Sequence, residues 1–371
     1  MENREWNSDK LGSVIEIKYG KDHKKLSEGN FPCLGSGGIM RYVDSYLYDD
    51  ESILIPRKGS LNNIMFQNNP FWTVDTMFWS KIDKSKVFPK YLFYQLTLID
   101  YENLNVGSAV PSLTVPVINE IEIQLPPLPE QKAIASVLSS LDDKIDLLHQ
   151  QNQTLEALAE TLFRQWFIEE AKEDWEEGKL EELVLSANTG LDAIRRAPIV
   201  ENYTGIKCLR IQDISQNKTF DNWGNTEVKD SDFVKAQLKR GDIIMARTCS
   251  PGILLHVQED LNAVFNNGLA RIRANENSHP IFLKYLFKTN EFINHIYGIS
   301  DGTAVQLNMK LGDLLSYDLK IPPINCIKKF VKIVSEWDDK ILSNHQQIQT
   351  LTQLRDTLLP KLMSGEVRVK V

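Results

Sequence analysis

Residues 125–167 of this 371-residue chain have a second copy 196 positions later, and this duplication constrains the fold more than any other feature. Asp-Asp-Lys-Ile at 142–145 recurs at 338–341, and His-Gln-Gln at 149–151 recurs at 345–347. A single register kept over dozens of residues indicates an internal duplication, which has to be interpreted before single motifs are.

Each copy is predicted to form a long amphipathic helix that begins after a Pro-Pro pair. Pro129 suits the first turn because proline lacks an N–H that the turn would leave unpaired, and Glu130 suits the positive end of the helix dipole. Apolar residues then follow heptad spacing, which requires a partner helix. The apolar seam of the first copy consists of Leu138, Leu141, Ile145, Leu148, Leu155 and Leu162. That of the second copy consists of Val334, Trp337, Ile341, Ile348, Leu351 and Leu358.

The two helices are expected to pair with each other as an antiparallel coiled coil. One register places Asn152 opposite Asn344 and small Ala159 opposite large Trp337. A buried Asn pair lowers stability but penalises every shifted register. The alternative is that each Asn lies on a solvated flank of its helix.

Composition describes an ordinary globular protein, with 42% hydrophobic and 25% charged residues. No apolar run reaches the roughly 18 residues of a membrane span, and the N-terminus does not look like a signal peptide. The cysteines lack CxxC spacing, so we expect reduced thiols in a cytoplasmic protein and no metal site. They are Cys33, Cys208, Cys249 and Cys326.

The net charge of −8 is concentrated in one segment. Residues 156–182 carry ten acidic and three basic residues, so the rest of the chain is close to neutral. Because phosphate attraction depends on where charges lie, a near-neutral body can still present a basic face to DNA. The acidic segment is expected to lie away from DNA or against a basic protein partner.

The regions between the helices also repeat, but only in outline. Ile53–Arg57 resembles Ile243–Arg247, and Gly107–Val110 resembles Gly302–Val305. The predicted fold class is α+β, with two mixed α/β domains separated by two long helices and related by a pseudo-two-fold repeat. The predicted boundaries are 1–125 and 173–321 for the domains, and 126–172 and 322–371 for the helical regions.

Within the first domain, four segments have a predicted secondary structure. Alternation or β-branched content predicts strands, and helical spacing behind a proline predicts a helix. The predicted strands are Ser52–Pro56, Phe71–Trp79 and Ile118–Leu125, and the predicted helix is Pro89–Leu98.

The two kinds of segment differ in how closely they repeat, and this suggests their roles. The helices keep their spacing, as parts that dock on the same kind of partner would. The domains keep framework strands but differ in loops, as readers of two different targets would. Helices of about 30–40 residues would be about 45–60 Å long, enough to separate two domains by more than one turn of DNA.

The strongest candidates for DNA contact are loops that follow the repeated strands or precede the closing strands. Arg can bind guanine through two hydrogen bonds, Asn can bind adenine, and Gly allows the backbone to approach a phosphate. The alternative is a solvated turn after a strand. The candidates in these loops are Arg57, Lys58, Gly59, Ser60, Asn62, Asn63, Gly107, Ser108, Arg247, Thr248, Ser250, Gly302 and Thr303. Lys207, Arg210 and Gln212 are further candidates, expected to line the DNA-reading surface of the second domain.

Two motifs could suggest an enzyme, but neither is complete. Asn68–Phe71 resembles the Asn-Pro-Pro-aromatic motif of amino-methyltransferases without its second proline. Leu34–Gly38 is rich in glycine but follows no clear buried strand. No catalytic residue is therefore predicted. The alternatives are a stand-alone DNA methyltransferase or nuclease, and a coiled-coil adaptor that does not bind DNA.

Three segments together carry a resemblance to a known family: Leu125–Ile134, the Asp-Asp-Lys-Ile that follows, and Leu359–Glu366. They look like the conserved regions of the specificity subunits of type I restriction–modification enzymes. The sequence departs from the pattern at Asn325–Ile327, where the first copy has Pro129–Gln131.

The resemblance implies two target-recognition domains, each binding half of a bipartite site in double-stranded DNA. It also implies that the helices dock two methyltransferase subunits, and that motor-nuclease subunits join for restriction. S-adenosylmethionine, ATP and magnesium would then serve those partners, and this chain would need no cofactor.

Overall fold

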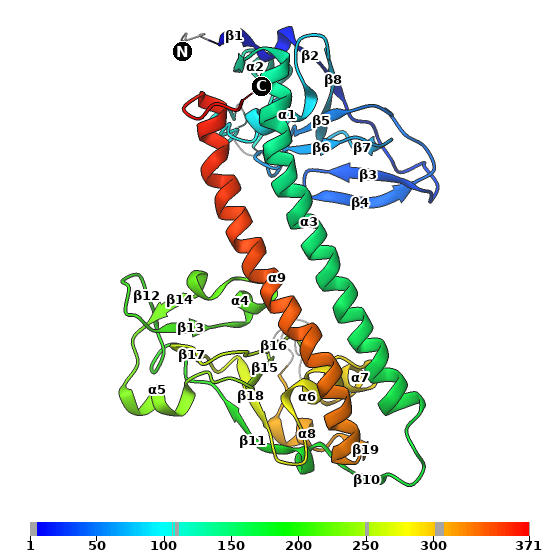
Figure 1. The fold of residues 1–371 in the computed structure, drawn as a ribbon, viewed down its shortest axis with the longest axis vertical. Helices are drawn as coiled ribbons and strands as arrows, with labels where there is room; N and C mark the ends of the chain where they lie inside the picture. Colours follow the sequence, from blue (N-terminus) through cyan, green and yellow to red (C-terminus); the bar gives the residue numbers. More distant parts are fainter. Residues whose placement is uncertain (1–5, 106, 108–110, 249–251, 301–307, 371) are drawn as a thin grey trace. The chain divides into compact units, whose positions relative to one another are not determined.

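The structure, a computed structural model, describes residues 6–105, 107, 111–248, 252–300 and 308–370 (Figure 1). The chain forms two compact units: unit 1 comprises residues 1–149 and 345–371, and unit 2 comprises residues 150–344. Each unit contains a mixed α/β domain and a portion of each of two long helices. We call these the first domain and the second domain. This repeated α/β plan confirms the predicted fold class.

The first domain is built from three small sheets with the orders β2-β8-β5-β6, β4-β3-β7 and β1-β9. Its strands are β1 (Asn7–Lys10), β2 (Ile15–Tyr19), β3 (Phe31–Gly35), β4 (Gly38–Val43), β5 (Ser52–Pro56), β6 (Met65–Gln67), β7 (Trp72–Thr73), β8 (Met77–Ile82) and β9 (Glu122–Leu125). Its helices are η1 (Leu11–Ser13), α1 (Pro89–Leu96) and α2 (Val115–Asn119).

The second domain repeats this topology with the orders β11-β18-β15-β16, β12-β14-β13-β17 and β10-β19. Its strands are β10 (Glu176–Lys179), β11 (Val184–Thr189), β12 (Ile199–Val200), β13 (Lys207–Leu209), β14 (Gly224–Thr226), β15 (Ile243–Ala246), β16 (Leu254–His256), β17 (Ala263–Phe265), β18 (Leu269–Ala274) and β19 (Asp318–Ile321). Its helices are η3 (Leu180–Leu183), α4 (Ile211–Ser215), η4 (Phe220–Asn222), α5 (Asp230–Ala236), α6 (Pro280–Leu286), α7 (Asn290–Ile299) and α8 (Leu311–Leu315).

The long helices are α3 (Leu128–Arg164), which continues into the π-helix η2 (Gln165–Glu169), and α9 (Ile324–Ser364). In unit 1, Leu138 near the start of α3 and Leu362 near the end of α9 lie in one buried cluster. In unit 2, Phe163 near the end of α3 and Phe330 near the start of α9 lie in another. In unit 1, Asp142, farther along α3, contacts Arg355, which lies earlier in α9. In unit 2, Asn152, earlier in α3, contacts Asn344, which lies later in α9. Within each unit, therefore, α3 and α9 run in opposite directions.

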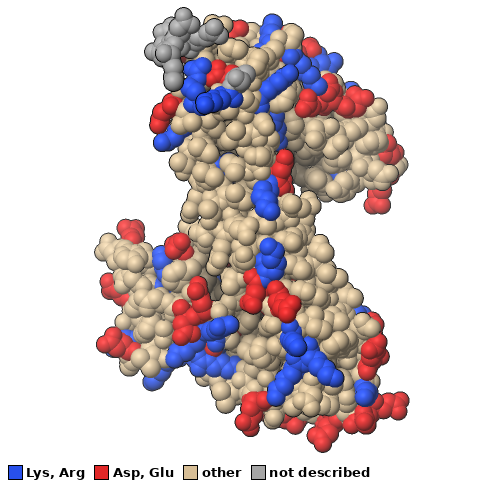
Figure 2. All heavy atoms as spheres, viewed as in Figure 1, with Lys and Arg blue, Asp and Glu red and all other residues tan. Residues whose placement is uncertain are grey.

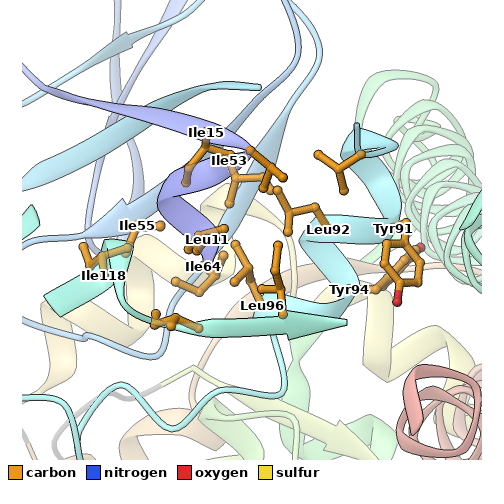
Figure 3. Close-up of a cluster of buried hydrophobic side chains, with 14 of the residues drawn as sticks. Leu11, Ile15, Ile53, Ile55, Ile64, Tyr91, Leu92, Tyr94, Leu96 and Ile118 are labelled. Carbon is orange, nitrogen blue, oxygen red and sulfur yellow. The ribbon is translucent and has the colours of Figure 1, made fainter. Parts of the chain in front are cut away.

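The core of the first domain joins its sheet to α1 and α3. Figure 3 shows Leu11, Ile53 and Leu92 among the side chains that fill it, and all three are fully buried. Pro89 begins α1, as proline can at the first position of a helix. Truncating a fully buried leucine of this kind typically costs about 2–5 kcal/mol, so this packing fixes where the loops at the sheet edge lie.

Each domain is also tied to the helix pair by a tyrosine and an aspartate. Tyr94 Oη in α1 donates to Asp142 Oδ2 in α3 at 2.5 Å. At the equivalent place in unit 2, Tyr285 Oη in α6 donates to Asp338 Oδ1 in α9 at 3.0 Å. The repeated Asp-Asp-Lys-Ile motif therefore supplies, in each unit, the carboxylate that fixes the domain to a long helix.

The cation beside that carboxylate comes from a different element in each unit. Arg355 in α9 pairs with Asp142 at 3.0 Å, whereas Lys284 in α6 pairs with Asp338 at 2.9 Å. The unit 1 pair is partly exposed and the unit 2 pair is almost fully buried. The repeated aspartate is thus more exposed to solvent in unit 1 than in unit 2.

The predictions for strand Ser52–Pro56 and for the helix that begins at Pro89 are confirmed, but two strand predictions are wrong in extent. Phe71–Trp79 is interrupted, because Val74 N donates to Leu34 O and Met77 N to Val74 O, which turns the chain from one sheet to another. Ile118–Leu125 begins with the end of α2, so its strand starts only at Glu122.

Candidate nucleic-acid interface

The Arg57 residue joins three segments at one edge of the first domain. Its N–H donates to Thr76 O at 2.8 Å, and its carbonyl accepts from Leu113 N at 2.9 Å. Its side-chain Nη1 donates to Asp75 O at 3.2 Å. The end of β5, the connection between β7 and β8, and the segment before α2 therefore meet at this arginine.

Arg247 makes the equivalent contacts in the second domain. Its N–H donates to Gly268 O at 3.0 Å, its carbonyl accepts from Met309 N at 2.8 Å, and Nη1 donates to Asn267 O at 3.2 Å. Nε also donates to Met309 O at 3.3 Å, and Nη2 donates to Asn308 Oδ1 at 3.0 Å. Three of the five guanidinium N–H groups of Arg247 are thus used within the chain.

The two arginines therefore differ in what they can offer a ligand. Arg57 uses one guanidinium N–H on its own domain, and its guanidinium lies over the ring of half-exposed Tyr19, with 5.5 Å between Cζ and the ring centroid. Counting only bonds to the described residues, four N–H groups of Arg57 remain available, whereas Arg247 keeps two. Of the pair, Arg57 is the better equipped to bind a base or a phosphate.

The other candidates of the first loop divide into exposed and engaged residues. Lys58, Gly59 and Ser60 lie in an exposed turn. Asn62 accepts from Tyr101 N through Oδ1 at 2.9 Å, and Asn63 donates to Ser36 O through Nδ2 at 2.7 Å. The two asparagine side chains hold the loop, so their amides are only partly free to read DNA.

The candidates before the closing strands fall largely outside the described residues. Gly107 is described, and its N–H donates to Asn105 Oδ1 at 2.8 Å. Ser108, Ser250, Gly302 and Thr303 lie outside the described residues. Thr248 is described and pairs with Asn308 in an isolated β-bridge, as Lys58 does with Ser112.

Lys207 and Arg210 have partners inside the second domain. Lys207 Nζ donates to Asp221 O at 3.0 Å and to Trp223 O at 3.1 Å. Arg210 Nε and Nη2 donate to the two carboxylate oxygens of Asp213, which is fully buried, at 2.9 and 3.0 Å. With its amide reoriented, Gln212 accepts from Arg210. These bonds brace the connection between β13 and β14.

That connection lies close to the Arg247 loop. A Cβ atom on Gly268 would lie 3.0 Å from Ile211 Cδ1 and 3.3 Å from Thr248 Oγ1. The structure therefore brings the segment that begins α4 together with Thr248.

The helix-pair residues predicted to face each other also lie together. Asn344 Nδ2 donates to Asn152 Oδ1 at 2.8 Å, and both residues are buried. Asn344 Nδ2 also donates to Gln151 Oε1 at 2.8 Å. Ala159 is fully buried in a cluster against which Trp337 packs. The polar pair is thus part of the helix interface and not of a solvated flank.

Sequence reasoning missed two basic loops. Lys24 and Lys25 follow β2, and Arg195 and Arg196 follow β11. A signal was present, because the Gly-x-Asp at residues 20–22 recurs at residues 190–192. The surrounding loops differ so much that this short match does not stand out.

Acidic side chains gather in unit 2, away from the candidate loops in sequence. Figure 2 shows Asp and Glu along the lower edge of unit 2 in this view. The segment around η2 and β10 carries exposed acidic residues, namely Glu169, Glu170, Glu173, Asp174, Glu176 and Glu177. This segment would repel DNA.

The described residues contain no group of three or more His, Cys, Asp or Glu that could hold a metal ion. Burial raises the pKa of the Cys208 thiol to about 12, which keeps it protonated and unreactive. Among the described residues, no helix is both long and apolar enough to cross a membrane.

Comparisons with known proteins agree with this geometry. A family model described as the type I restriction modification DNA specificity domain matches residues 3–157 and 172–353. The chain is similar to the specificity subunit of the type I restriction enzyme MjaIX of Methanocaldococcus jannaschii, with 28% identity over 427 residues covering 99% of this chain and 94% of that protein. It is also similar to the HindI specificity subunit of Haemophilus influenzae, with 22% identity over 367 residues covering 76% and 78%.

The fold is similar to a crystal structure of the type I restriction–modification S subunit from M. genitalium. The TM-score is 0.65 at 18% sequence identity, and the match covers 98% of this chain and 97% of the other. At this identity the likeness concerns the fold.

Proposed function

Because the chain belongs to the family of type I restriction–modification DNA specificity subunits, we propose that its two domains each bind one half of a bipartite DNA site. The observation that carries this proposal is the pair of domains with one framework and different loops. Only Ser36 and Gly37 connect β3 to β4, whereas the equivalent connection from β13 to β14 contains α4 and η4. Different loops on one framework suit two different half-sites.

The long helices would dock two methyltransferase subunits, and motor-nuclease subunits would join for restriction. The two helix starts are not alike. Gln131 of α3 bonds to Phe88 N and Pro126 O at 2.8 Å each, whereas its counterpart in α9 is the buried apolar Ile327. The two docked subunits would therefore meet somewhat different surfaces. An assembly acting on chromosomal DNA would work in the cytoplasm.

This chain would be non-catalytic. Its charged loop residues can bind DNA, but the groups that transfer a methyl group or hydrolyse ATP would belong to the partners, together with S-adenosylmethionine, ATP and magnesium. A purified chain that methylates or cleaves DNA by itself would overturn this assignment and favour a stand-alone enzyme.

Domain exchange tests the recognition of two half-sites. Residues 1–125 are replaced by the corresponding domain of another specificity subunit, and the assembly with its methyltransferases is expressed in cells. Mapping methylated adenines should show that one half-site changes and the other stays.

The matched control replaces residues 173–321 instead and should change only the other half-site. If either exchange changes both half-sites, the one-domain-per-half-site proposal is wrong. If the assembly has no DNA affinity at any salt concentration, the chain is an adaptor without a role in recognition.

A further inference from the structure

Two loops occupy the same place in the two domains. Loop A comprises residues 20–25 after β2, and loop B comprises residues 190–196 after β11. Gly20 N donates to Met77 O at 3.0 Å and Lys21 N to Thr73 O at 2.8 Å. In the second domain, Gly190 N donates to Leu269 O at 3.2 Å and Leu191 N to Phe265 O at 2.9 Å. The two loops therefore leave their sheets in the same way.

A glycine begins each loop because the chain passes very close to its neighbour. A Cβ atom on Gly20 would lie 1.9 Å from Val74 O, and one on Gly190 would lie 2.2 Å from Asn266 O. Only glycine fits such a close approach. The exit direction of each loop is thus set by the framework and not by the loop's own sequence.

In each loop an aspartate side chain accepts hydrogen bonds from the backbone of the residues that follow it, and two consecutive basic residues lie just after this turn. Asp22 Oδ1 accepts from Lys24 N at 3.1 Å. Asp192 Oδ1 accepts from Ile194 N at 3.0 Å and from Arg195 N at 2.7 Å. Such local side-chain bonds to the backbone fix a tight turn.

The cations at these turns are exposed. They are Lys24 and Lys25 in loop A, and Arg195 and Arg196 in loop B. Arg196 is held by Asp232, with 2.5 Å between Nη2 and Oδ1. In the described part of the chain, Lys24, Lys25 and Arg195 form no ion pair with another side chain. These three cations are therefore available to an external anion.

Each basic loop adjoins the loop that begins with Arg57 in the first domain or with Arg247 in the second. In the first domain, loop A donates to Thr73 O at the end of β7, and Arg57 donates to Asp75 O in the connection that follows β7. In the second domain, loop B donates to Phe265 O at the end of β17, and Arg247 donates to Asn267 O in the connection that follows β17. Each basic loop and the loop that begins with Arg57 or Arg247 thus form one edge of their domain.

We propose that loop A and loop B each contact DNA phosphates next to the bases that their own domain reads. This inference rests on the proposed function. Two domains that read different bases need different reading loops, but every half-site presents the same phosphates. Cation pairs at equivalent positions on otherwise dissimilar loops fit that constant part of DNA, because phosphate contacts fix position without reading sequence.

Salt dependence of binding tests the proposal. The specificity subunit carrying K24Q and K25Q is assembled with its methyltransferases, and DNA affinity is measured at several salt concentrations. The slope of log K against log salt is negative, and each phosphate contact that is lost should make it less negative by about 0.9, so the pair should change it by up to about 2. Arg195→Gln should make it less negative by up to about 1.

Matched controls carry the same charge change at the far end of the same sheets. Lys84 and Lys86 lie just beyond the end of β8 that pairs with the start of β2, and Arg240 precedes β15 while Arg247 follows it. The K84Q/K86Q and R240Q variants should keep the slope of the unmodified assembly. All variants should methylate the same sequence, because phosphate contacts do not select bases.

The outcomes separate the two claims. An unmodified assembly that binds DNA without sequence preference would refute the proposed function. If that assembly binds its site but the loop variants keep the control slope, only the inference is wrong. It is also wrong if the loop variants change the methylated sequence, since the loops would then read bases. Loss of methyltransferase subunits from the loop variants would instead identify a protein-docking surface.

Discussion

Arg57 and Arg247 illustrate how equivalent residues can serve different ends. Both join the same three segments through their backbone, and both donate Nη1 to one carbonyl at 3.2 Å. Arg247 adds two bonds to the segment at Asn308 and Met309 that Arg57 lacks. We infer that Arg247 mainly holds its loops in position, whereas Arg57 keeps donors for DNA.

Substitution of each arginine tests this difference. Arg247→Ala removes three side-chain hydrogen bonds and should lower the free energy of unfolding by about 3 kcal/mol, at about 1 kcal/mol per bond. Arg57→Ala removes one such bond and should lower it by about 1 kcal/mol. Urea unfolding of the purified chain measures both. Equal losses would contradict the assignment.

His256 in β16 should make stability depend on pH. Burial lowers its pKa to about 4, with Lys284 as the next cause. An unfolded histidine binds a proton near pH 6.5, so the unfolded state holds more protons between about pH 6.5 and 4. The contribution of His256 to the free energy of unfolding should therefore be at its full value above about pH 6.5. As the pH decreases below about 6.5, the free energy of unfolding should fall, by about 2 kcal/mol at pH 5.

The measurement compares urea unfolding of the unmodified chain and of the His256→Gln variant at pH 7 and pH 5. The variant should lose less stability over this interval. Burial also lowers the pKa of His279, but that contribution is common to both chains and cancels in the comparison. An identical pH dependence of the two chains would show that His256 does not titrate as inferred.

At the scale of elements, the tyrosine–aspartate contacts determine how α1 and α6 sit on the long helices. Asp338 is 4% exposed and Lys284 beside it is also buried, whereas Asp142 and Arg355 keep 24% and 30% of their side-chain surface exposed. Breaking a buried ion pair leaves an uncompensated charge, which a partly exposed pair does not.

Asp338→Asn should therefore destabilise unit 2 by about 3 kcal/mol, because it leaves Lys284 charged and buried. Asp142→Asn should destabilise unit 1 by only about 1 kcal/mol, since water can solvate Arg355. Denaturant unfolding of the two variants provides the comparison. A larger loss for Asp142→Asn would reverse the argument.

The buried asparagine pair should show coupling. Asn344→Leu alone leaves the Asn152 amide without its buried partner and should cost about 1–3 kcal/mol. Replacing both asparagines by leucine removes that penalty, so the double variant should be at least as stable as either single variant. A double-mutant cycle from urea unfolding measures the coupling. Additive effects would indicate that the two amides act independently.

At the scale of the whole molecule, the two ends of the chain belong to one unit. Leu362 and Met363 near the end of α9 complete the core that contains Leu11 and Leu138, and Arg368 forms an ion pair with Glu130 at 2.6 Å. Unit 1 therefore cannot complete its core until α9 has been synthesised.

Truncation tests this dependence. A chain that stops after residue 361 loses Leu362, Met363 and Arg368, and should lose several kcal/mol in unit 1, as large core truncations do. A control chain lacking only residues 370 and 371 should keep its stability. Limited proteolysis of unit 1 in the two chains distinguishes them. Equal protection in both would show that the C-terminal residues are dispensable.

The long helices and strand Ser52–Pro56 could be predicted because their patterns are local: runs without glycine or proline, heptad spacing and β-branched residues. The break within Phe71–Trp79 could not be predicted, because it depends on a bond from Val74 to Leu34, far away in sequence. The internal partners of Arg247 were hidden for the same reason. The basic loops were missed because their shared position is set by a sheet, while their sequences have little in common.

The element that supplies the cation beside the repeated aspartate differs between the two units, and this makes the two directions of domain exchange unequal. Phe93 stands where the second domain has Lys284, and Ala159 stands where the other helix has Arg355. A second domain transplanted into the first position would bring Lys284 to an aspartate already matched by Arg355. A first domain transplanted into the second position would leave Asp338 with a tyrosine and no cation. Gene rearrangements of this chain should therefore tolerate the first exchange and select against the second.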